Sequence, residues 1–308
     1  MKFKAAAILA SLFLATLSAA AQAALPSIFT VGDSTCKNSG NGRNGQPIQG
    51  WGTPLGTDAP GWTAPFDKSK CTVKNVGHAG KSATTYYTGD WIAGQNVVSQ
   101  IQPGDFVILV MGINGDPHNG NDDTVSANGQ HSYGWYMRKM ATDTIEKGGH
   151  PYFLTLTNRD TWSNPNAKFD DTGNITSQQP GYDPKADKLP NLDPHVNLTL
   201  QIGEQLHLPV FNLNAYQMDE YLKQGREKIA PLYSDHNHTY IPGAQQLSKF
   251  VVAGLKSFKN SPFIPLLSDA GKAIPAADAK YIKDNIPEAT ATATAPATAP
   301  AANSAAPK

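Results

Sequence analysis

Residues 105–112 read Asp-Phe-Val-Ile-Leu-Val-Met-Gly, a continuous apolar run that a glycine brings to an end. Residues 27–32, Ser-Ile-Phe-Thr-Val-Gly, form a second run of this kind, rich in β-branched and aromatic side chains. Short runs without polar alternation are typical of parallel strands that are buried on both faces. The two runs therefore predict central strands of an α/β sheet.

Strand-like and helix-like stretches alternate along the rest of the chain. Further strands are expected at 71–76, 151–157 and 209–213, and helices at 91–101, 132–147, 194–206 and 242–258. This alternation predicts a three-layer α/β/α sandwich with a mainly parallel central sheet, flavodoxin-like in class, and with right-handed crossovers. In such sheets the working residues lie just beyond the carboxyl ends of the strands. Asp33, Ser34 and Asn114 follow the first two predicted strands and are expected at that edge.

The charge balance and composition exclude two classes of protein. Of 308 residues, 25 are Lys or Arg and 25 are Asp or Glu, so the formal net charge is zero. A chain without a net field does not attract a polyanion over distance, which argues against a nucleic-acid-binding protein. A hydrophobic content of 40% supports a sizeable core and excludes disorder over the whole length.

Both ends of the chain differ in composition from its middle. Residues 1–23 place Lys2 and Lys4 before a short apolar run and end in Ala21-Gln22-Ala23, the pattern of a cleaved secretory signal. Residues 269–308 become increasingly rich in Ala, Thr and Pro and predict a low-complexity tail. We therefore expect one domain over residues 24–268 and a secreted, monomeric protein without a membrane anchor.

The two cysteines, Cys36 and Cys71, are an even number in a chain expected to reach an oxidising compartment. A disulfide between them would contribute on the order of 4 kcal/mol through the closed loop. Two free thiols are the alternative.

Ser34 and the segment Asp235-His236-Asn237-His238 carry residue types that suit nucleophilic catalysis. An aspartate three residues before a histidine can hold one ring nitrogen of the imidazole, while the other ring nitrogen takes a proton from a serine hydroxyl. Because Asp235, His236 and His238 are also metal-ligand types, a metal site is the competing interpretation.

Two glycine-rich loops, residues 77–82 and 112–115, each follow a predicted strand. A backbone N–H from the first loop and the side-chain amide of Asn114 could converge beside Ser34 as an oxyanion hole. The acidic segment 116–123 contains many oxygen ligands and could hold calcium, but it lacks the acid spacing of an EF-hand, so a solvated loop is the simpler interpretation.

Taken in chain order, these motifs resemble those of the SGNH (GDSL-like) hydrolases, and above all the rhamnogalacturonan acetylesterase branch. The resemblance covers residues 27–257. It rests on four blocks: Gly32-Asp33-Ser34-Thr35; Gln49-Gly50-Trp51-Gly52; Ala79-Gly80-Lys81-Ser82; and Asp235 to Thr239 with Pro242-Gly243-Ala244.

The resemblance implies Ser34 as nucleophile, His238 as general base and Asp235 as the carboxylate that orients it. It also implies an oxyanion hole formed by the backbone N–H groups of Ser34 and Gly80 and by the side chain of Asn114. The sequence departs from the family pattern in one block, which commonly has a histidine before the asparagine and an aspartate directly after it. Here Ile113 precedes Asn114, and Gly115 separates Asn114 from Asp116.

The expected function is that of a secreted serine esterase that removes acetyl groups from plant cell-wall polysaccharide, with pectic rhamnogalacturonan as the first choice of substrate. The reaction would pass through an acyl-enzyme and would need neither a metal ion nor an organic cofactor. Polar segments at 38–49, 114–130 and 158–166 are expected to border Ser34 and to suit sugar hydroxyls better than acyl chains. The alternatives are a xylan acetylesterase, a short-chain esterase or lipase of the same fold, and a catalytically inert carbohydrate-binding protein.

Overall fold

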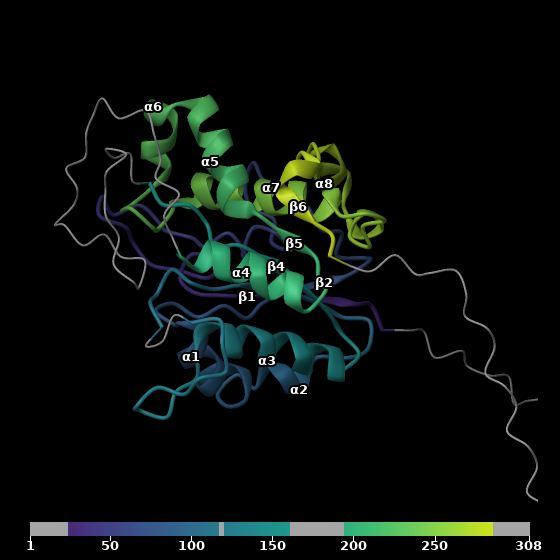
Figure 1. Cartoon of the computed structure of the whole chain (residues 1–308). Coiled ribbons are helices and arrows are strands. Elements are labelled where there is room, and N and C mark those ends of the chain that lie inside the picture. The colour runs from purple at the N-terminus through teal and green to yellow at the C-terminus, as the bar shows by residue number, and fades with distance from the viewer. Residues whose placement is uncertain (1–23, 117–119, 161–193, 286–308) are drawn as a thin grey trace, which may run out of the picture.

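The computed structural model describes residues 24–116, 120–160 and 194–285, and its centre is a single six-stranded sheet (Figure 1). The strand order is β2-β1-β3-β4-β5-β6. The strands are β1 (Ser27–Gly32), β2 (Thr72–Asn75), β3 (Phe106–Val110), β4 (His150–Leu154), β5 (Val210–Phe211) and β6 (Ile282–Lys283). Strands β1 to β5 pair in parallel, whereas β6 pairs with β5 in the antiparallel direction.

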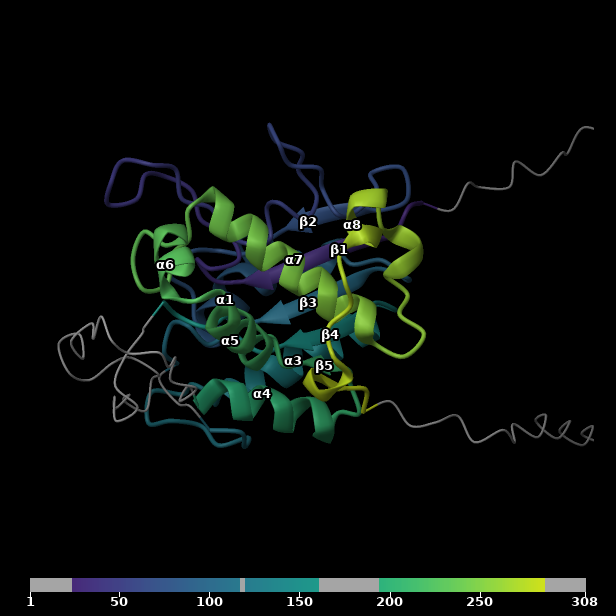
Figure 2. The same cartoon turned by 90° about the horizontal axis from the view of Figure 1, so that it is seen from above.

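Helices cover both faces of the sheet, so that the molecule has three layers (Figures 1 and 2). The helices are α1 (Ala83–Tyr86), the π-helix Tyr87–Trp91, α2 (Val97–Gln100), α3 (Tyr133–Glu146), α4 (Pro194–Gln205), α5 (Leu213–Gln224), α6 (Arg226–Ile229), α7 (Ile241–Ser257) and α8 (Asp269–Ala273), together with 3₁₀ turns at Ala230–Leu232, Ile264–Leu266 and Ala279–Tyr281. In Figure 1, α1, α2 and α3 lie below the sheet, and α5, α7 and α8 lie above it.

The core lies between these layers because successive side chains of a strand point to opposite faces of the sheet. In β3, Phe106, Ile108 and Val110 face the hydrophobic cluster that includes α5 and α7. Val107 and Leu109 face the second cluster, which includes α3. Since all five residues of β3 are buried, the strand reads as an unbroken apolar run in the sequence.

The predicted fold class is confirmed, and so are the five predicted parallel strands, to within a few residues at their ends. The helices expected at 132–147, 194–206 and 242–258 are α3, α4 and α7. The stretch 91–101 is different, because it contains the end of a π-helix and the short α2 instead of one helix.

The expected domain boundary at residue 268 needs correction. Helix α8 and strand β6 follow it, and β6 completes the sheet beside β5. The pairing is short, and an antiparallel edge strand of two residues shows little of the periodicity that strand prediction uses. The folded part of the chain therefore continues to Asn285, while the expected leader at 1–23 lies outside the described residues. Within the described ranges, no helix is long and apolar enough to cross a bilayer.

The predicted disulfide is wrong, because both cysteines are free and buried. Cys36 Sγ lies 3.4 Å from Asn75 Oδ1 at the carboxyl end of β2, whereas Cys71 directly precedes the first residue of that strand. At a rise of about 3.3 Å per residue, the Cα atoms of Cys71 and Asn75 lie roughly 13 Å apart, so the two cysteines lie at opposite ends of β2. A disulfide needs Cα atoms within about 7 Å, so the two thiols cannot meet in this fold.

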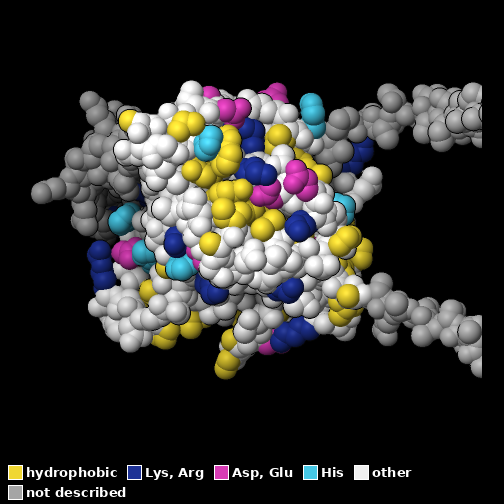
Figure 3. Space-filling view, turned by 90° about the horizontal axis from the view of Figure 1, so that it is seen from below, with side chains coloured by type: hydrophobic (Ala, Val, Ile, Leu, Met, Phe, Trp, Pro, Cys, Tyr) yellow, Lys and Arg dark blue, Asp and Glu magenta, His cyan; other side chains and the backbone are white. Residues whose placement is uncertain are grey.

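One surface of the molecule is richer in apolar groups than its surroundings. Figure 3 views the layer of α1, α2 and α3 from outside and shows hydrophobic side chains gathered among basic and acidic ones. Ile92 and Ile145, which belong to this layer, are 50% and 51% exposed.

Candidate active site

Ser34 lies in the turn that directly follows β1, at the carboxyl edge of the sheet. The carbonyl oxygen of Asp33 accepts hydrogen bonds from the backbone N–H groups of Cys36 and Lys37, which closes the turn. Gly32 is required there, since an added Cβ would lie 2.5 Å from Cys36 Cβ. The turn therefore holds the Ser34 side chain at the end of a rigid strand.

His238 and Asp235 come from the loop that leads into α7, and they meet Ser34 across the sheet edge. Ser34 Oγ lies 2.9 Å from His238 Nε2, and His238 Nδ1 lies 2.8 Å from Asp235 Oδ2. Asp235 Oδ1 accepts the backbone N–H groups of Asn237 and His238, both at 2.8 Å. The three side chains form one continuous chain of hydrogen bonds from carboxylate to hydroxyl.

The loop that holds His238 is tied to the segment that follows the Ser34 turn. Thr239 Oγ1 donates to the carbonyl oxygen of Gln49 at 2.8 Å, and the Gln49 N–H donates to the carbonyl oxygen of Thr239. The Ser234 N–H donates to the carbonyl oxygen of His238. These bonds fix the histidine although 204 positions separate it from Ser34.

The electrostatics of the pair suit a general base. The hydrogen bond to Asp235 raises the pKa of His238 above its ordinary value of 6.5, against the opposing effect of partial burial. Burial acts to raise the pKa of Asp235, but the hydrogen bonds from His238 and from two backbone N–H groups outweigh it and hold that pKa well below its usual range. Asp235 is therefore a carboxylate at neutral pH, and it stabilises a protonated His238.

A second aspartate, Asp33, directly precedes Ser34 in the turn after β1 and is 1% exposed. Its Oδ1 accepts the N–H and the hydroxyl of Thr35 at 2.8 and 2.9 Å, and its carboxyl group also accepts the backbone N–H of Ile113. Burial raises the pKa of Asp33 despite these bonds. Asp33 therefore connects the Ser34 turn with the loop after β3.

That loop contains Asn114, whose side-chain amide donates to the carbonyl oxygen of Lys81 at 3.1 Å. Lys81 belongs to the other glycine-rich loop, next to Gly80, which has a φ of +78° and open space where a Cβ would stand. The structure thus joins the two loops that were expected to supply the oxyanion donors. The roles of the Ser34, Gly80 and Asn114 donors remain predictions.

Ile113, the departure from the family pattern, points away from the solvent. It is 4% exposed and packs with Leu156 and Val196 in a small hydrophobic cluster. Its carbonyl oxygen accepts a hydrogen bond from Arg159 Nη2 at 3.2 Å. Gly112 before it has a φ of +129°, and a Cβ there would meet the His195 side chain at 2.8 Å. The isoleucine therefore anchors the loop and leaves Asn114 at the edge.

The metal-site interpretation of the Asp235 loop has no geometric support in the described residues. Both carboxylate oxygens of Asp235 already accept hydrogen bonds from within the loop. Among the residues that the structure describes, no group of three or more His, Cys, Asp or Glu side chains could hold a metal ion.

The acidic segment 116–123 is engaged within the protein, as far as it is described. Asp116 binds backbone N–H groups at the start of α1, Asp122 accepts the N–H and hydroxyl of Thr124, and Asp123 lies 2.8 Å from Arg138. Residues 117–119 and the part of the expected sugar rim at 161–166 lie outside the described residues.

A second histidine–aspartate pair holds the Gly80 loop. His78 Nδ1 lies 3.0 Å from the Asp90 carboxylate, and Gln95 Nε2 donates to Asp90 Oδ1 at 3.0 Å. Lys81 Nζ is 3.6 Å from the same carboxylate, which is 5% exposed. The sequence contained no signal for Asp90. It placed Asp33 at the sheet edge and Asp116 in the acidic segment, but it did not predict their hydrogen bonds to the Asn114 loop and to α1.

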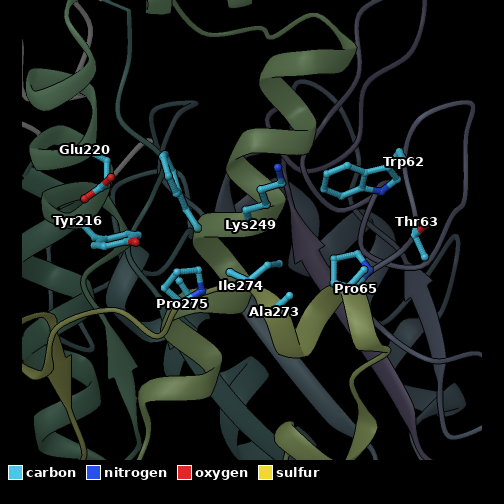
Figure 4. Close-up of a pocket in the computed structure, with 12 residues that line it drawn as sticks. Trp62, Thr63, Pro65, Tyr216, Glu220, Lys249, Ala273, Ile274 and Pro275 are labelled. Carbon is cyan, nitrogen blue, oxygen red and sulfur yellow. The ribbon is translucent and has the colours of Figure 1, made fainter.

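A hollow of about 540 Å³ lies away from Ser34, on the side of the sheet that α7 covers. Trp62, Pro65, Tyr216, Lys249 and Ile274 are among the residues that line it (Figure 4). None of its lining residues belongs to the hydrogen-bonded chain of Ser34, His238 and Asp235.

Comparisons with known proteins support the fold. No model of a protein family and no curated protein matches the chain. Among solved structures, the protein YXIM from Bacillus subtilis superposes with a TM-score of 0.54 at 21% identity, over 75% of this chain and 56% of its own. The chain thus spans just over half the length of that protein, and the likeness shows a shared α/β/α fold.

Variants of Axe2 from Geobacillus stearothermophilus also match over most of their length. One, described as an acetyl xylan esterase, superposes with a TM-score of 0.46 at 15% identity, over 82% of this chain and 97% of its own. Another, described as an acetyl-xylooligosaccharide esterase, gives 0.45 at 15% identity, over 74% and 92%. With TM-scores below 0.5, these superpositions are similarities only.

Proposed function

We propose that the protein is a secreted serine esterase of SGNH type that removes acetyl groups from a plant cell-wall polysaccharide. The observation that carries the proposal is the unbroken chain of hydrogen bonds from Asp235 through His238 to Ser34, at the carboxyl edge of the sheet. Nucleophile, base and orienting carboxylate within hydrogen-bond reach define an activated serine.

The reaction follows from the positions of these atoms. Ser34 Oγ attacks the acetyl carbonyl carbon while its proton moves to His238 Nε2, and Asp235 stabilises the imidazolium. His238 then returns the proton to the departing sugar oxygen, leaving an acetyl ester on Ser34. Water then attacks the acetyl ester while its proton moves to His238 Nε2. His238 returns that proton to Ser34 Oγ as the ester bond breaks and acetate leaves.

The oxyanion of each tetrahedral intermediate would be held by the backbone N–H groups of Ser34 and Gly80 and by the Asn114 amide. Asn114 Nδ2 has two N–H bonds, and one is directed at the carbonyl oxygen of Lys81. The other has no acceptor among the described residues and can donate to the oxyanion. Each such donor is typically worth about 3 to 4 kcal/mol of the barrier.

Within this function, pectic rhamnogalacturonan is the proposed substrate. The segments beside the site contain polar groups: the Arg43 N–H donates to Ser234 Oγ next to Asp235, and Gln49 is bonded to Thr239 next to His238. Such surroundings suit sugar hydroxyls better than methylene chains, which gain about 0.8 kcal/mol each only where apolar surface receives them. Acetylated xylan is the competing substrate.

The test is release of acetate from acetylated pectin, acetylated xylan and an aryl acetate by one preparation, with Ser34→Ala as the control. We expect a higher kcat/KM per acetyl group on pectin than on the aryl acetate, because contacts with remote sugars help to orient the ester. We expect a folded Ser34→Ala protein to lose activity by about 10⁴-fold or more.

The outcomes separate the levels of the proposal. A Ser34→Ala protein within a few-fold of wild type would remove the serine mechanism. A preference for acetylated xylan over pectin would replace rhamnogalacturonan as the proposed substrate. Equal rates on octanoyl and acetyl esters would remove the carbohydrate specificity and leave only the serine esterase mechanism.

A further inference from the structure

We propose that Asp116 is a positioning residue that sets the distance between the two loops of the oxyanion hole. The proposal rests on the proposed serine esterase function. Asp116 is 3% exposed, and its two carboxylate oxygens reach across to the start of α1. Oδ1 accepts the Thr84 N–H at 2.8 Å, and Oδ2 accepts the Ala83 N–H at 3.3 Å.

These two bonds connect the same segments that the Asn114 amide connects. Asn114 lies two positions before Asp116 and binds the carbonyl oxygen of Lys81, which lies two positions before Ala83. The loop after β3 is therefore joined to the Gly80 loop at two places, one on each side of Gly115. The joint nearer to α1 is a buried carboxylate on two N–H groups, and charge-assisted hydrogen bonds of this kind are the stronger ones.

Each donor loop contains a glycine, whose backbone freedom this joint limits. Gly80 has a left-handed φ of +78° and no neighbouring atom within 4 Å of an added Cβ. Gly115 adds one residue of freedom between the amide and the carboxylate. A donor contributes to catalysis only if it lies where the oxyanion forms, and an error of about 1 Å can cost a hundredfold in rate.

The experiment compares two matched substitutions, Asp116→Asn and Asp105→Asn. Asp105 is 4% exposed and binds two backbone N–H groups, those of Ser27 at 2.6 Å and Gln102 at 2.9 Å, but it lies at the amino edge of the sheet. In both variants the new side chain has one acceptor oxygen in place of two. Both lose a buried hydrogen bond, and only one loses it beside the oxyanion hole.

For Asp116→Asn we expect kcat on an aryl acetate to fall by about 10- to 100-fold, with KM within about threefold of wild type. The donors act on the oxyanion and not on the bound ester, so the loss appears in kcat. The rate of Ser34 phosphorylation by diethyl p-nitrophenyl phosphate should fall by a similar factor, since its phosphoryl oxygen needs the same donors. The acid limb of the pH profile should not move, because the bonded chain of His238 is intact.

The concentration of active sites is measured by titration of Ser34 with the same reagent, and kcat is calculated per active site. An unfolded fraction of the variant then does not lower the measured kcat. The Asp105→Asn protein should keep kcat within about threefold of wild type even if its melting temperature falls. If Asp116→Asn does not yield folded protein, Asp116→Glu decides the question, because it keeps both acceptor oxygens and changes only their reach. The same fall in kcat is then expected.

Three results would overturn the inference: an Asp116 variant with wild-type kcat, a loss confined to KM, or an equal fall in kcat for Asp105→Asn. A wild-type protein that neither hydrolyses esters nor reacts at Ser34 would instead overturn the proposed function, which keeps the two failures distinct.

Discussion

Two histidine–aspartate pairs lie near the carboxyl edge of the sheet. Their distances between ring nitrogen and carboxylate are nearly equal, but their surroundings differ. In the first, His238 Nδ1 is 2.8 Å from Asp235, and its other ring nitrogen faces Ser34 Oγ. In the second, His78 Nδ1 is 3.0 Å from Asp90, and that carboxylate is shared with Gln95 and Lys81.

The difference shows that a histidine–aspartate contact acquires a chemical role from its third partner. His238 can pass a proton because a hydroxyl lies at the far nitrogen. Asp90, by contrast, binds several groups of one loop and thereby holds the segment that carries Gly80. For Asp90, burial acts to raise the pKa, but the hydrogen bonds from Gln95 and His78 hold it below its usual range. Both carboxylates are therefore charged at neutral pH, but Asp235 holds a histidine whose other ring nitrogen faces the Ser34 hydroxyl.

Asp235→Asn is expected to give the larger loss, about 10³- to 10⁴-fold in kcat. If the new side chain keeps its oxygen on the N–H groups of Asn237 and His238, its NH₂ group faces His238 Nδ1. The ring proton of His238 then lies on Nε2, and this nitrogen can no longer accept the proton of Ser34. Steady-state kinetics on an aryl acetate measures the effect.

The same variant should also move the acid limb of the pH profile. Wild-type activity rises with pH as His238 loses its proton, so the limb lies above 6.5 because Asp235 raises that pKa. Without the negative charge the proton is held less tightly, and the residual activity should have its limb at lower pH. An unchanged limb would contradict the assignment of His238 as base.

Asp90→Asn is expected to lower kcat/KM by less than about tenfold and to leave the acid limb in place. None of the bonds of Asp90 within the described residues involves His238, so only the position of the Gly80 loop should change. The measurement uses the same assay and the same pH series. A loss as large as that of Asp235→Asn would mean that the second pair takes part in the chemistry.

The smallest effect is expected from reducing agent, which should not change the melting temperature. Cys36 and Cys71 are separate, and burial raises their thiol pKa values to about 12 and about 11, so both are protonated at neutral pH. Mass analysis after unfolding and alkylation without reduction should find two labelled thiols. A mass lower by two hydrogen atoms, with no label, would restore the disulfide.

The sequence was informative wherever the relevant geometry is local. Apolar runs predicted the parallel strands, since burial on both faces leaves an unbroken pattern. The spacing of Asp235 and His238 predicted their contact, because three residues in one loop can bring a carboxylate to an imidazole. Contacts between distant segments were harder to predict. The disulfide prediction failed because the sequence does not show that β2 separates Cys36 from Cys71.

By itself, then, the sequence determined the layered α/β class, the turn that presents Ser34 and the short-range pair of His238 with Asp235. Tertiary structure decided that this pair meets a serine 204 positions away. It also decided that Asp116 accepts the N–H groups at the start of α1, that the two thiols remain apart and that β6 adds an edge strand to the sheet. The physical reason is that a short segment can specify its own backbone path and burial pattern, whereas contacts between distant segments depend on how all strands and helices pack together.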